Sequence, residues 1–191
     1  MNLITRRAIR RAALAAVAAI SMLALAATVA QAKTVTVTGG QATFTPSSQL
    51  TRALSNHGIT AQAIPPATLA SDGVLSMPVI GGHFSRPHHR GDLLLGGGVK
   101  FTKGTHSLAL RRLVAVHVQR GSFLTASVRG KRHVIARFIH VTRSVSDHTA
   151  TLNADAVLSA RAADLINAQA GHHVVGRGAP LGTASATVNF G

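Results

Sequence analysis

The chain has 191 residues, no cysteine and a formal net charge of +15, because 20 lysines and arginines face only five acidic residues, all of them Asp. The lack of cysteine excludes a fold held by disulfides, so packing alone must stabilise this protein. The basic balance favours anionic partners such as wall polymers or acidic lipids, and it also fits the arginine-rich composition that a GC-rich genome encodes.

The first 32 residues have the pattern of a secretory signal. Four arginines between residues 6 and 11 precede an apolar run at residues 12–30, and Ala30 and Ala32 provide the small side chains that signal peptidase requires. Sec signals and twin-arginine signals both carry such arginines, so the export route stays open. Because the run is rich in alanine and ends at a cleavage site, removal is favoured over retention as a membrane anchor. We therefore expect a signal peptide at residues 1–32 and a single exported domain at residues 33–191.

The exported part is large enough for one domain with a real core. It keeps sixteen of the basic residues and all five Asp, which leaves a net charge of +11. No later apolar stretch approaches the ~20 residues of a membrane span. We therefore expect no transmembrane segment after the signal, and a location outside the cell or in the cell envelope.

A short strand followed by a helix is predicted near the start of this domain. Thr45 is a candidate helix cap, Pro46 suits the first helical position and Gly58 is a candidate helix stop. After this helix, residues 64–73 are predicted to form a loop rich in proline and glycine, and residues 81–98 an irregular segment.

Period-two patterns in the middle of the chain predict a three-stranded antiparallel meander. Over residues 106–118 the even positions are apolar with one interruption, which indicates a strand with one buried face. Three-residue turns at residues 119–121 and 130–132 would connect the strands, and the first turn would place Val116 opposite Leu124.

The same strand, cap and helix pattern recurs near the C-terminus. Asn153 is the candidate cap, Asp155 suits the positive helix start, an apolar stripe runs from Ala154 to Ile166, and Gly171 is the candidate stop. Together the patterns predict a mainly β domain, with an antiparallel meander or sandwich-like sheet and two short helices, one near each end of the exported chain.

Histidine is the residue type that points to a ligand. Neutral imidazoles suit zinc, copper or haem iron. A zinc site needs three or four converging ligands and the chain has no Cys or Glu, so solvated histidines are the alternative and no metal site is assigned. Haem is favoured over a dedicated metal ion, because one axial ligand, an apolar slot and cations for the propionates suffice. The candidate ligand-binding residues gather in the segment predicted to be irregular: His83, Arg86, His88, His89 and Arg90.

Basic side chains also gather at the two expected hairpin tips. Arg120 lies at the first tip, and Arg129, Lys131 and Arg132 lie at the second. They are candidate contacts for an anionic polymer, and solvated surface charge is the alternative. The chain has no Trp or Tyr on which bases could stack, so no specific nucleic-acid role is expected.

Known catalytic motifs are absent from the sequence. It contains no G-x-S-x-G elbow, no H-E-x-x-H, no P-loop and no pair of carboxylates at a useful spacing. No catalytic residue is therefore assigned, and we expect a protein without enzymatic activity.

Two stretches rich in glycine and apolar residues resemble a known family. GDLLLGGGVKF at residues 91–101, followed by GSFLTASV at residues 121–128, resembles secreted actinobacterial β-rich proteins related to the HtaA haem-uptake domain. PVIGG at residues 78–82 and LGTA at residues 181–184 are also similar to such proteins. The resemblance implies an exported, β-rich surface domain involved in haem capture.

The chain departs from that family at the haem ligands. Haem binding in the HtaA domain relies on Tyr with a supporting His, whereas this chain has no Tyr and has Leu95 at the position of the family's His. No ligand is carried over, so a bound haem would take its ligand from His83, His88 or His89.

The sequence therefore predicts an exported binding protein without enzymatic activity, at the cell surface or wall, for haem or another anionic ligand. The alternative is a basic envelope protein held on anionic wall polymers or lipids by charge, with no small-molecule site. Charge-only association is lost as salt rises, whereas an iron–imidazole bond survives, so salt separates the two predictions.

Overall fold

The computed structural model describes residues 34–85, 90–171 and 173–191. The strands and helices of the described residues belong to the unit Lys33–Gly191, which has its own core. The predicted signal peptide at residues 1–32 lies outside the described residues. In the described part of the chain, no helix is long and apolar enough to cross a membrane.

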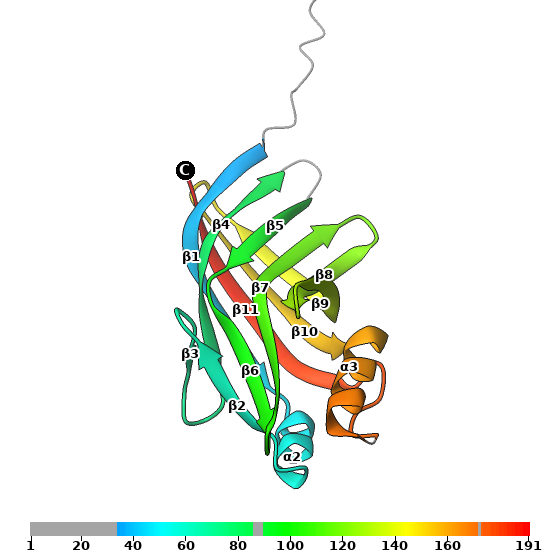
Figure 1. Cartoon of the computed structure of the whole chain (residues 1–191). Coiled ribbons are helices and arrows are strands. Elements are labelled where there is room, and N and C mark those ends of the chain that lie inside the picture. The colour runs from blue at the N-terminus through cyan, green and yellow to red at the C-terminus, as the bar shows by residue number, and fades with distance from the viewer. Residues whose placement is uncertain (1–33, 86–89, 172) are drawn as a thin grey trace, which may run out of the picture. The chain divides into compact units, whose positions relative to one another are not determined.

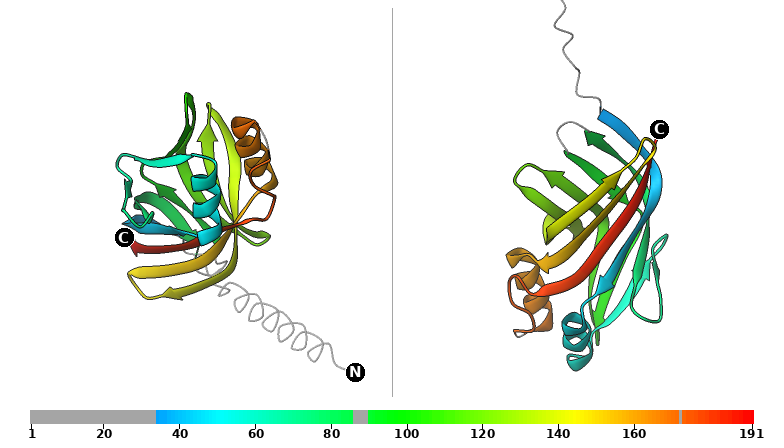
Figure 2. Two further views of the ribbon diagram at one scale, coloured as in Figure 1. Left: turned by 90° about the horizontal axis from the view of Figure 1, so that it is seen from below. Right: turned by 180° about the vertical axis from the view of Figure 1, so that it is seen from behind.

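Antiparallel strands dominate the fold, as predicted (Figure 1). The helices are α2 (Ser48–Asn56) and α3 (Ala160–Ala170), and both lie at the same end of the molecule (Figures 1 and 2). The strands are β1 (Thr34–Pro46), β2 (Thr60–Ile64), β3 (Thr68–Leu69), β4 (Leu75–Ser85), β5 (Arg90–Leu95), β6 (Gly98–Lys103), β7 (His106–Val118), β8 (Gly121–Val128), β9 (Lys131–Val145), β10 (Thr149–Leu158) and β11 (Pro180–Phe190).

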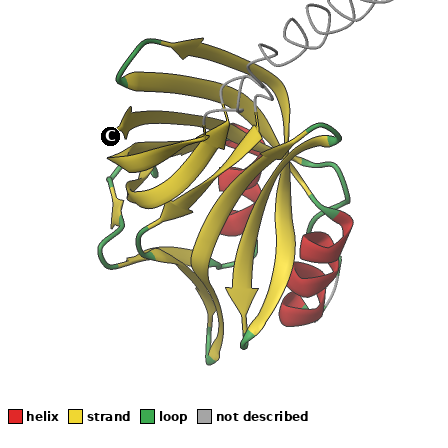
Figure 3. Cartoon of the chain, turned by 90° about the horizontal axis from the view of Figure 1, so that it is seen from above, coloured by secondary structure: helices red, strands yellow, loops and turns green. Residues whose placement is uncertain are grey.

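Eight of these strands close into an antiparallel barrel, rather than the open meander or sandwich-like sheet that the sequence predicted. The order around the ring is β7-β5-β4-β1-β11-β10-β9-β8, and β8 pairs back with β7. Seen from the end opposite the helices, the strands are arranged in a ring (Figure 3). Closure removes the exposed strand edges that an open sheet of this length would present.

Strand β7 is the branch point of the sheet. Its first half pairs with β6 from His106 to Arg111, and its second half pairs with β5 from Val114 to His117. β2 then pairs with β6 and extends the sheet beyond the ring. β4 and β5 also fill much of the segment at residues 81–98, so the prediction of irregular structure there was wrong.

A bulge in β7 reverses the predicted inward face of this strand. The bulge lies at Arg112, which has a φ of 50°, in the left-handed region. Before it Leu110 is buried, and after it the buried residue is Leu113 rather than Val114. Val118, an even position of the second half, is therefore 37% exposed rather than buried.

Both hairpin turns are one residue shorter than predicted. Val118 pairs with Gly121, so the first loop is residues 119–120, and Ala115 rather than Val116 lies opposite Leu124. The second loop is Arg129 and Gly130, whose φ angles of 49° and 81° suit a two-residue hairpin turn. These loops fix the register of the strands that line the barrel.

The helices begin later than predicted, because strands continue through the expected caps. Ser47, not Thr45, caps α2 and accepts a hydrogen bond from Leu50 N at 3.1 Å. Ser159, not Asn153, caps α3 and accepts one from Ala162 N at 3.0 Å. The stop at Gly171 is confirmed, since it is the left-handed C-cap of α3 with a φ of 75°.

The buried core residues come from strands that are distant in sequence but neighbours in the barrel. Val37 of β1 and Val188 of β11 are each 2% exposed, and Ala126 of β8 is completely buried. The rings of Phe84 and Phe190 stack with centroids 5.7 Å apart. Ala162 and Ala163 anchor α3 to this core with exposed fractions of 2% and 4%.

Candidate functional site

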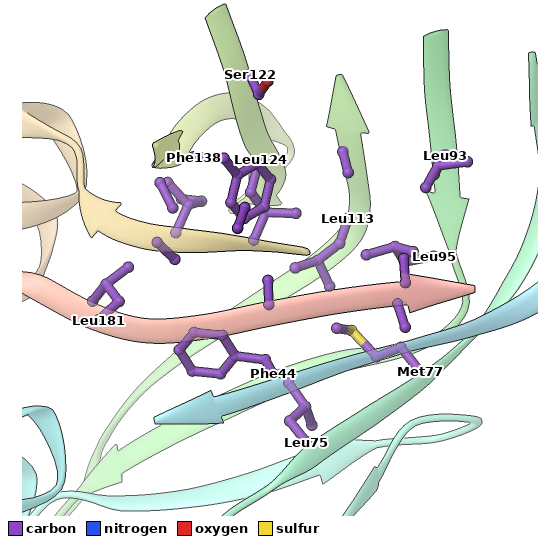
Figure 4. A pocket seen from close by; sticks show the side chains of 18 of the residues that line it. Phe44, Leu75, Met77, Leu93, Leu95, Leu113, Ser122, Leu124, Phe138 and Leu181 are labelled. Carbon is purple, nitrogen blue, oxygen red and sulfur yellow. The ribbon is translucent and has the colours of Figure 1, made fainter. Parts of the chain in front are cut away.

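The barrel encloses a cavity of about 510 Å³. Phe44, Met77, Leu93, Leu124 and Phe138 point into it from different strands (Figure 4). Small-molecule pockets have volumes of about 300–1,000 Å³ and mostly apolar linings. The cavity therefore has the size and the chemistry of a ligand-binding site.

Small side chains in the barrel wall leave this space open. Eight-stranded barrels have an interior that either side chains fill or one small ligand occupies. Here alanines stand at many inward positions, so the interior is left partly unfilled. The alanines that line the cavity are Ala42, Ala115, Ala136, Ala150, Ala154, Ala156, Ala184 and Ala186.

A polar pair lies in the cavity lining. Nδ1 of His117 on β7 shares a 2.6 Å hydrogen bond with Oγ of Ser122 on β8, and Ser122 is only 7% exposed. The two residues are register partners, and the next partner of Ser122 is Phe138 of β9. The bond fixes an imidazole beside an aromatic and aliphatic surface.

Basic groups outnumber acidic groups in the lining. Lys103 and His106 face each other across the β6–β7 hairpin, and Arg143 lies on β9. Asp92 is the acidic residue in the described lining, against Lys103, Arg143 and the imidazoles of His83, His106 and His117. The two cations, Lys103 and Arg143, outnumber the one carboxylate in this lining, so its net charge favours an anionic group.

Of the five residues in the predicted ligand-binding cluster, the structure describes His83 and Arg90. Nδ1 of His83 lies 3.5 Å from Oδ1 of Asp92, with the His83 side chain 67% exposed at the edge of the cavity. Arg90 is exposed at the start of β5, opposite Ser85. Arg86, His88 and His89 lie outside the described residues, so their role stays a prediction.

The predicted polyanion contacts fall into two separate groups. Arg120 lies in the β7–β8 loop, whereas Arg129, Lys131 and Arg132 lie at the β8–β9 turn. These turns stand at opposite ends of the eight-residue strand β8, about 23 Å apart at the usual rise of an extended chain. One small anion cannot contact both groups, but a polymer or an extended surface can.

Sequence reasoning missed His117 and Ser122 as cavity residues. The alternation pattern assigned the even positions of β7 to the core, which left His117 on the outside. The signal for the reversal is the adjacent pair Arg111 and Arg112 between Leu110 and Leu113, because two consecutive charges cannot continue a strict alternation. Such a pair indicates a bulge, after which the inward positions are odd.

The donor set of the cavity fits haem better than a closed metal site. Among the described residues, no group of three or more His, Cys, Asp or Glu side chains could hold a metal ion. One axial ligand such as an imidazole, apolar walls and cations near the propionates are sufficient to bind haem. His83, His106 and His117 offer imidazoles in the lining, and Lys103 and Arg143 offer the cations.

Comparisons with known proteins show which fold this barrel shares. No family model matches the chain, and no curated protein matches it. Among solved structures, the C-terminal domain of HtaA from Corynebacterium glutamicum has a TM-score of 0.66 at 17% identity, covering 82% of this chain and 99% of that chain. The N-terminal domain of HtaA from the same organism has a TM-score of 0.57 at 12% identity, covering 81% and 98% respectively.

The heme binding protein HtaB from Corynebacterium glutamicum is also similar, with a TM-score of 0.57 at 12% identity over 83% of this chain and 96% of that chain. These identities are low, so the likeness is one of fold. The resemblance to the HtaA domain that the sequence predicted is thereby confirmed at the level of the fold.

Proposed function

We propose that the chain is an exported binding protein whose barrel interior holds haem. The observation that carries the proposal is the apolar cavity of about 510 Å³ with imidazoles and cations in its lining. An amphiphilic anion matches this lining, because its apolar body replaces water at the aliphatic walls while its charged groups meet the basic residues.

Haem is the ligand of this class that best uses all three features of the lining. Its macrocycle is large and apolar, its propionates are anionic, and its iron accepts an imidazole ligand. The structural likeness to a heme binding protein, HtaB, supports the same choice. The chain has no Tyr or Cys, and we propose that the axial ligand is one of the histidines in the lining.

The proposed role is capture or carriage outside the cell, without catalysis. The signal pattern at residues 1–32 supports export, and the basic surface supports association with an anionic envelope. Haem supplies the iron chemistry when bound, whereas the chain's own residues enclose the macrocycle, exclude water and orient the imidazole.

A visible-absorbance titration tests the proposal. The unit Lys33–Gly191 is titrated with haem at low and at moderate salt, and the Soret band is followed. The proposal predicts a saturable Soret shift that survives the rise in salt, because an iron–imidazole bond is not screened as surface charge is. A shift that disappears at moderate salt supports instead a basic envelope protein without a small-molecule site.

Alanine variants identify the axial ligand. His83→Ala, His106→Ala and His117→Ala each remove one imidazole from the described lining, and His148→Ala removes one from the exposed β9–β10 turn as a matched control. One of the three lining variants is expected to abolish the spectrum of histidine-ligated haem while the control keeps it. Wild-type spectra in all three variants would exclude an axial histidine from the described lining.

A further inference from the structure

The outer face of β4, β5, β7, β8 and β9 carries a band of apolar side chains. On β7 the band includes Val114, which the bulge at Arg112 turns outward. Leu94 pairs with Val114, and Val114 and Val134 both pair with Thr125, so these residues lie in one row across the sheet. We define the outer band as the following residues: Ile80, Leu94, Val114, Phe123 and Val134.

Several of these side chains are exposed to solvent. Leu94 and Val134 are each 39% exposed, and Ile80 of the neighbouring strand β4 is 64% exposed. Single exposed apolar residues are ordinary, but apolar side chains gathered on neighbouring strands mark a surface that can contact another molecule.

Arginines border the outer band at both ends. Arg111 and Arg132 belong to one row, since both pair with Ser127. The Arg132 guanidinium donates a 2.7 Å hydrogen bond to Thr125 Oγ1, which holds it along the edge of the band. Arg137 lies opposite Phe123, and Arg120 occupies the loop at the far end.

We propose that this face docks on the surface of a membrane rich in anionic lipids. Arginines would contact the lipid phosphates, and the apolar side chains between them would enter the boundary between headgroups and acyl chains. Asp92, which pairs with Val116 beside the band, is one carboxylate against the four arginines Arg111, Arg120, Arg132 and Arg137. The proposal uses the outer face and is therefore independent of haem in the cavity.

The charge and polarity of this face favour an anionic membrane over a wall polymer or a second copy of the chain. A phosphate-rich wall polymer would satisfy the arginines but would leave the apolar band in water. A second copy of the chain would cover the band, but it would bring two arginine borders together, and like charges across an interface are repulsive. A surface with both phosphate and hydrocarbon matches both features of this face.

Vesicle sedimentation tests the proposal. The unit Lys33–Gly191 is used because the apolar run at residues 12–30 would bind vesicles by itself. We expect sedimentation with vesicles of equal parts phosphatidylcholine and phosphatidylglycerol, and none with phosphatidylcholine alone. The triple variant R111Q/R132Q/R137Q should lose about tenfold or more in vesicle partitioning, and I80S/L94S/V134S should lose a similar factor.

A charge-matched control separates this face from the net charge. R52Q/R161Q/R177Q removes the same charge from exposed arginines outside the outer band and should lose much less partitioning than R111Q/R132Q/R137Q. Equal losses in the two arginine triples, or full binding by I80S/L94S/V134S, would overturn the proposal. Concentration-dependent dimerisation that I80S/L94S/V134S abolishes, without vesicle binding, would also overturn it in favour of a second copy. Circular dichroism and haem titration should be unchanged in every variant, which shows that the fold and the cavity are intact.

Discussion

Nδ1 of His117 and Oγ of Ser122 lie 2.6 Å apart across the β7–β8 pair, in the lining of the barrel cavity. Their register follows from the two-residue loop at residues 119–120, and the inward position of His117 follows from the bulge at Arg112. Two local backbone features therefore place an imidazole inside an apolar chamber.

Replacing Ser122 tests the importance of this pair. Ser122→Ala removes a hydrogen-bond partner of His117 in a partly buried position, and should lower the free energy of unfolding by about 1 kcal/mol. It should also weaken haem binding several-fold, because the imidazole loses one of the contacts that orient it. Urea denaturation followed by circular dichroism and haem titration measure the two effects. The control is Ser127→Ala, at an outward position on the same strand, which should change stability and haem affinity little. Equal effects of the two variants would contradict a role of the His117–Ser122 hydrogen bond in orienting the imidazole.

The position of the second helix cap is directly testable. Ser159 Oγ accepts a hydrogen bond from Ala162 N and donates a 2.6 Å bond to Val134 O. Ser159→Ala should therefore cost about 1–2 kcal/mol of stability. Asn153→Ala should cost less than about 0.5 kcal/mol, because Asn153 is exposed in the middle of β10 rather than at a helix start. A larger loss for Asn153→Ala in thermal unfolding would show that the helix begins where the sequence predicted.

The bulge at Arg112 predicts an unusual response to glycine. A left-handed conformation costs a residue with a side chain about 1–2 kcal/mol, whereas glycine in a regular strand costs about 0.5–1 kcal/mol. Arg112→Gly should therefore leave stability unchanged or raise it slightly. Arg111→Gly, one residue earlier in the extended strand, should lower it. The denaturant midpoints of the two variants measure this difference. A lower midpoint for Arg112→Gly than for Arg111→Gly would contradict the bulge.

Gly182 marks a close approach between β11 and β1. Its φ is 144°, and a Cβ there would collide with the carbonyl oxygen of Thr45. Gly182→Ala should therefore destabilise the protein by about 2–4 kcal/mol. Gly176→Ala serves as the control, because a Cβ at Gly176 meets no atom within 4 Å. Similar melting temperatures for the two variants would rule out the close approach.

Patterns within single segments predicted much of this fold. The pairing of strands that are distant in sequence could not be predicted from such patterns. Alternation identified β7 with its bounds at residues 106 and 118, and glycine at position 171 identified the end of α3. The barrel closes through the pairing of β7 with β5. This pairing uses backbone hydrogen bonds, and no residue motif in either strand marks the other as its partner. Closure therefore could not be inferred from the pattern of any single segment.

The site was harder to predict than the fold, because its residues depend on register. A shift of one residue moves every side chain of a strand to the other face. The bulge at Arg112 causes such a shift, so His117 lies in the cavity lining and Val118, which was predicted to be buried, is exposed. The histidines themselves were visible in the sequence, but the face of each one was decided by the backbone.

Blocking the cavity is the most direct test of the central claim. Ala115 lies in the lining and Ala109 faces outward on the same strand, opposite Lys100. Haem titrations of Ala115→Phe and Ala109→Phe therefore compare the same added ring inside and outside the barrel, after circular dichroism has confirmed that both variants fold. We predict that Ala115→Phe loses the salt-resistant Soret shift and that Ala109→Phe keeps it. Undiminished haem binding by a folded Ala115→Phe variant would contradict binding in the barrel interior.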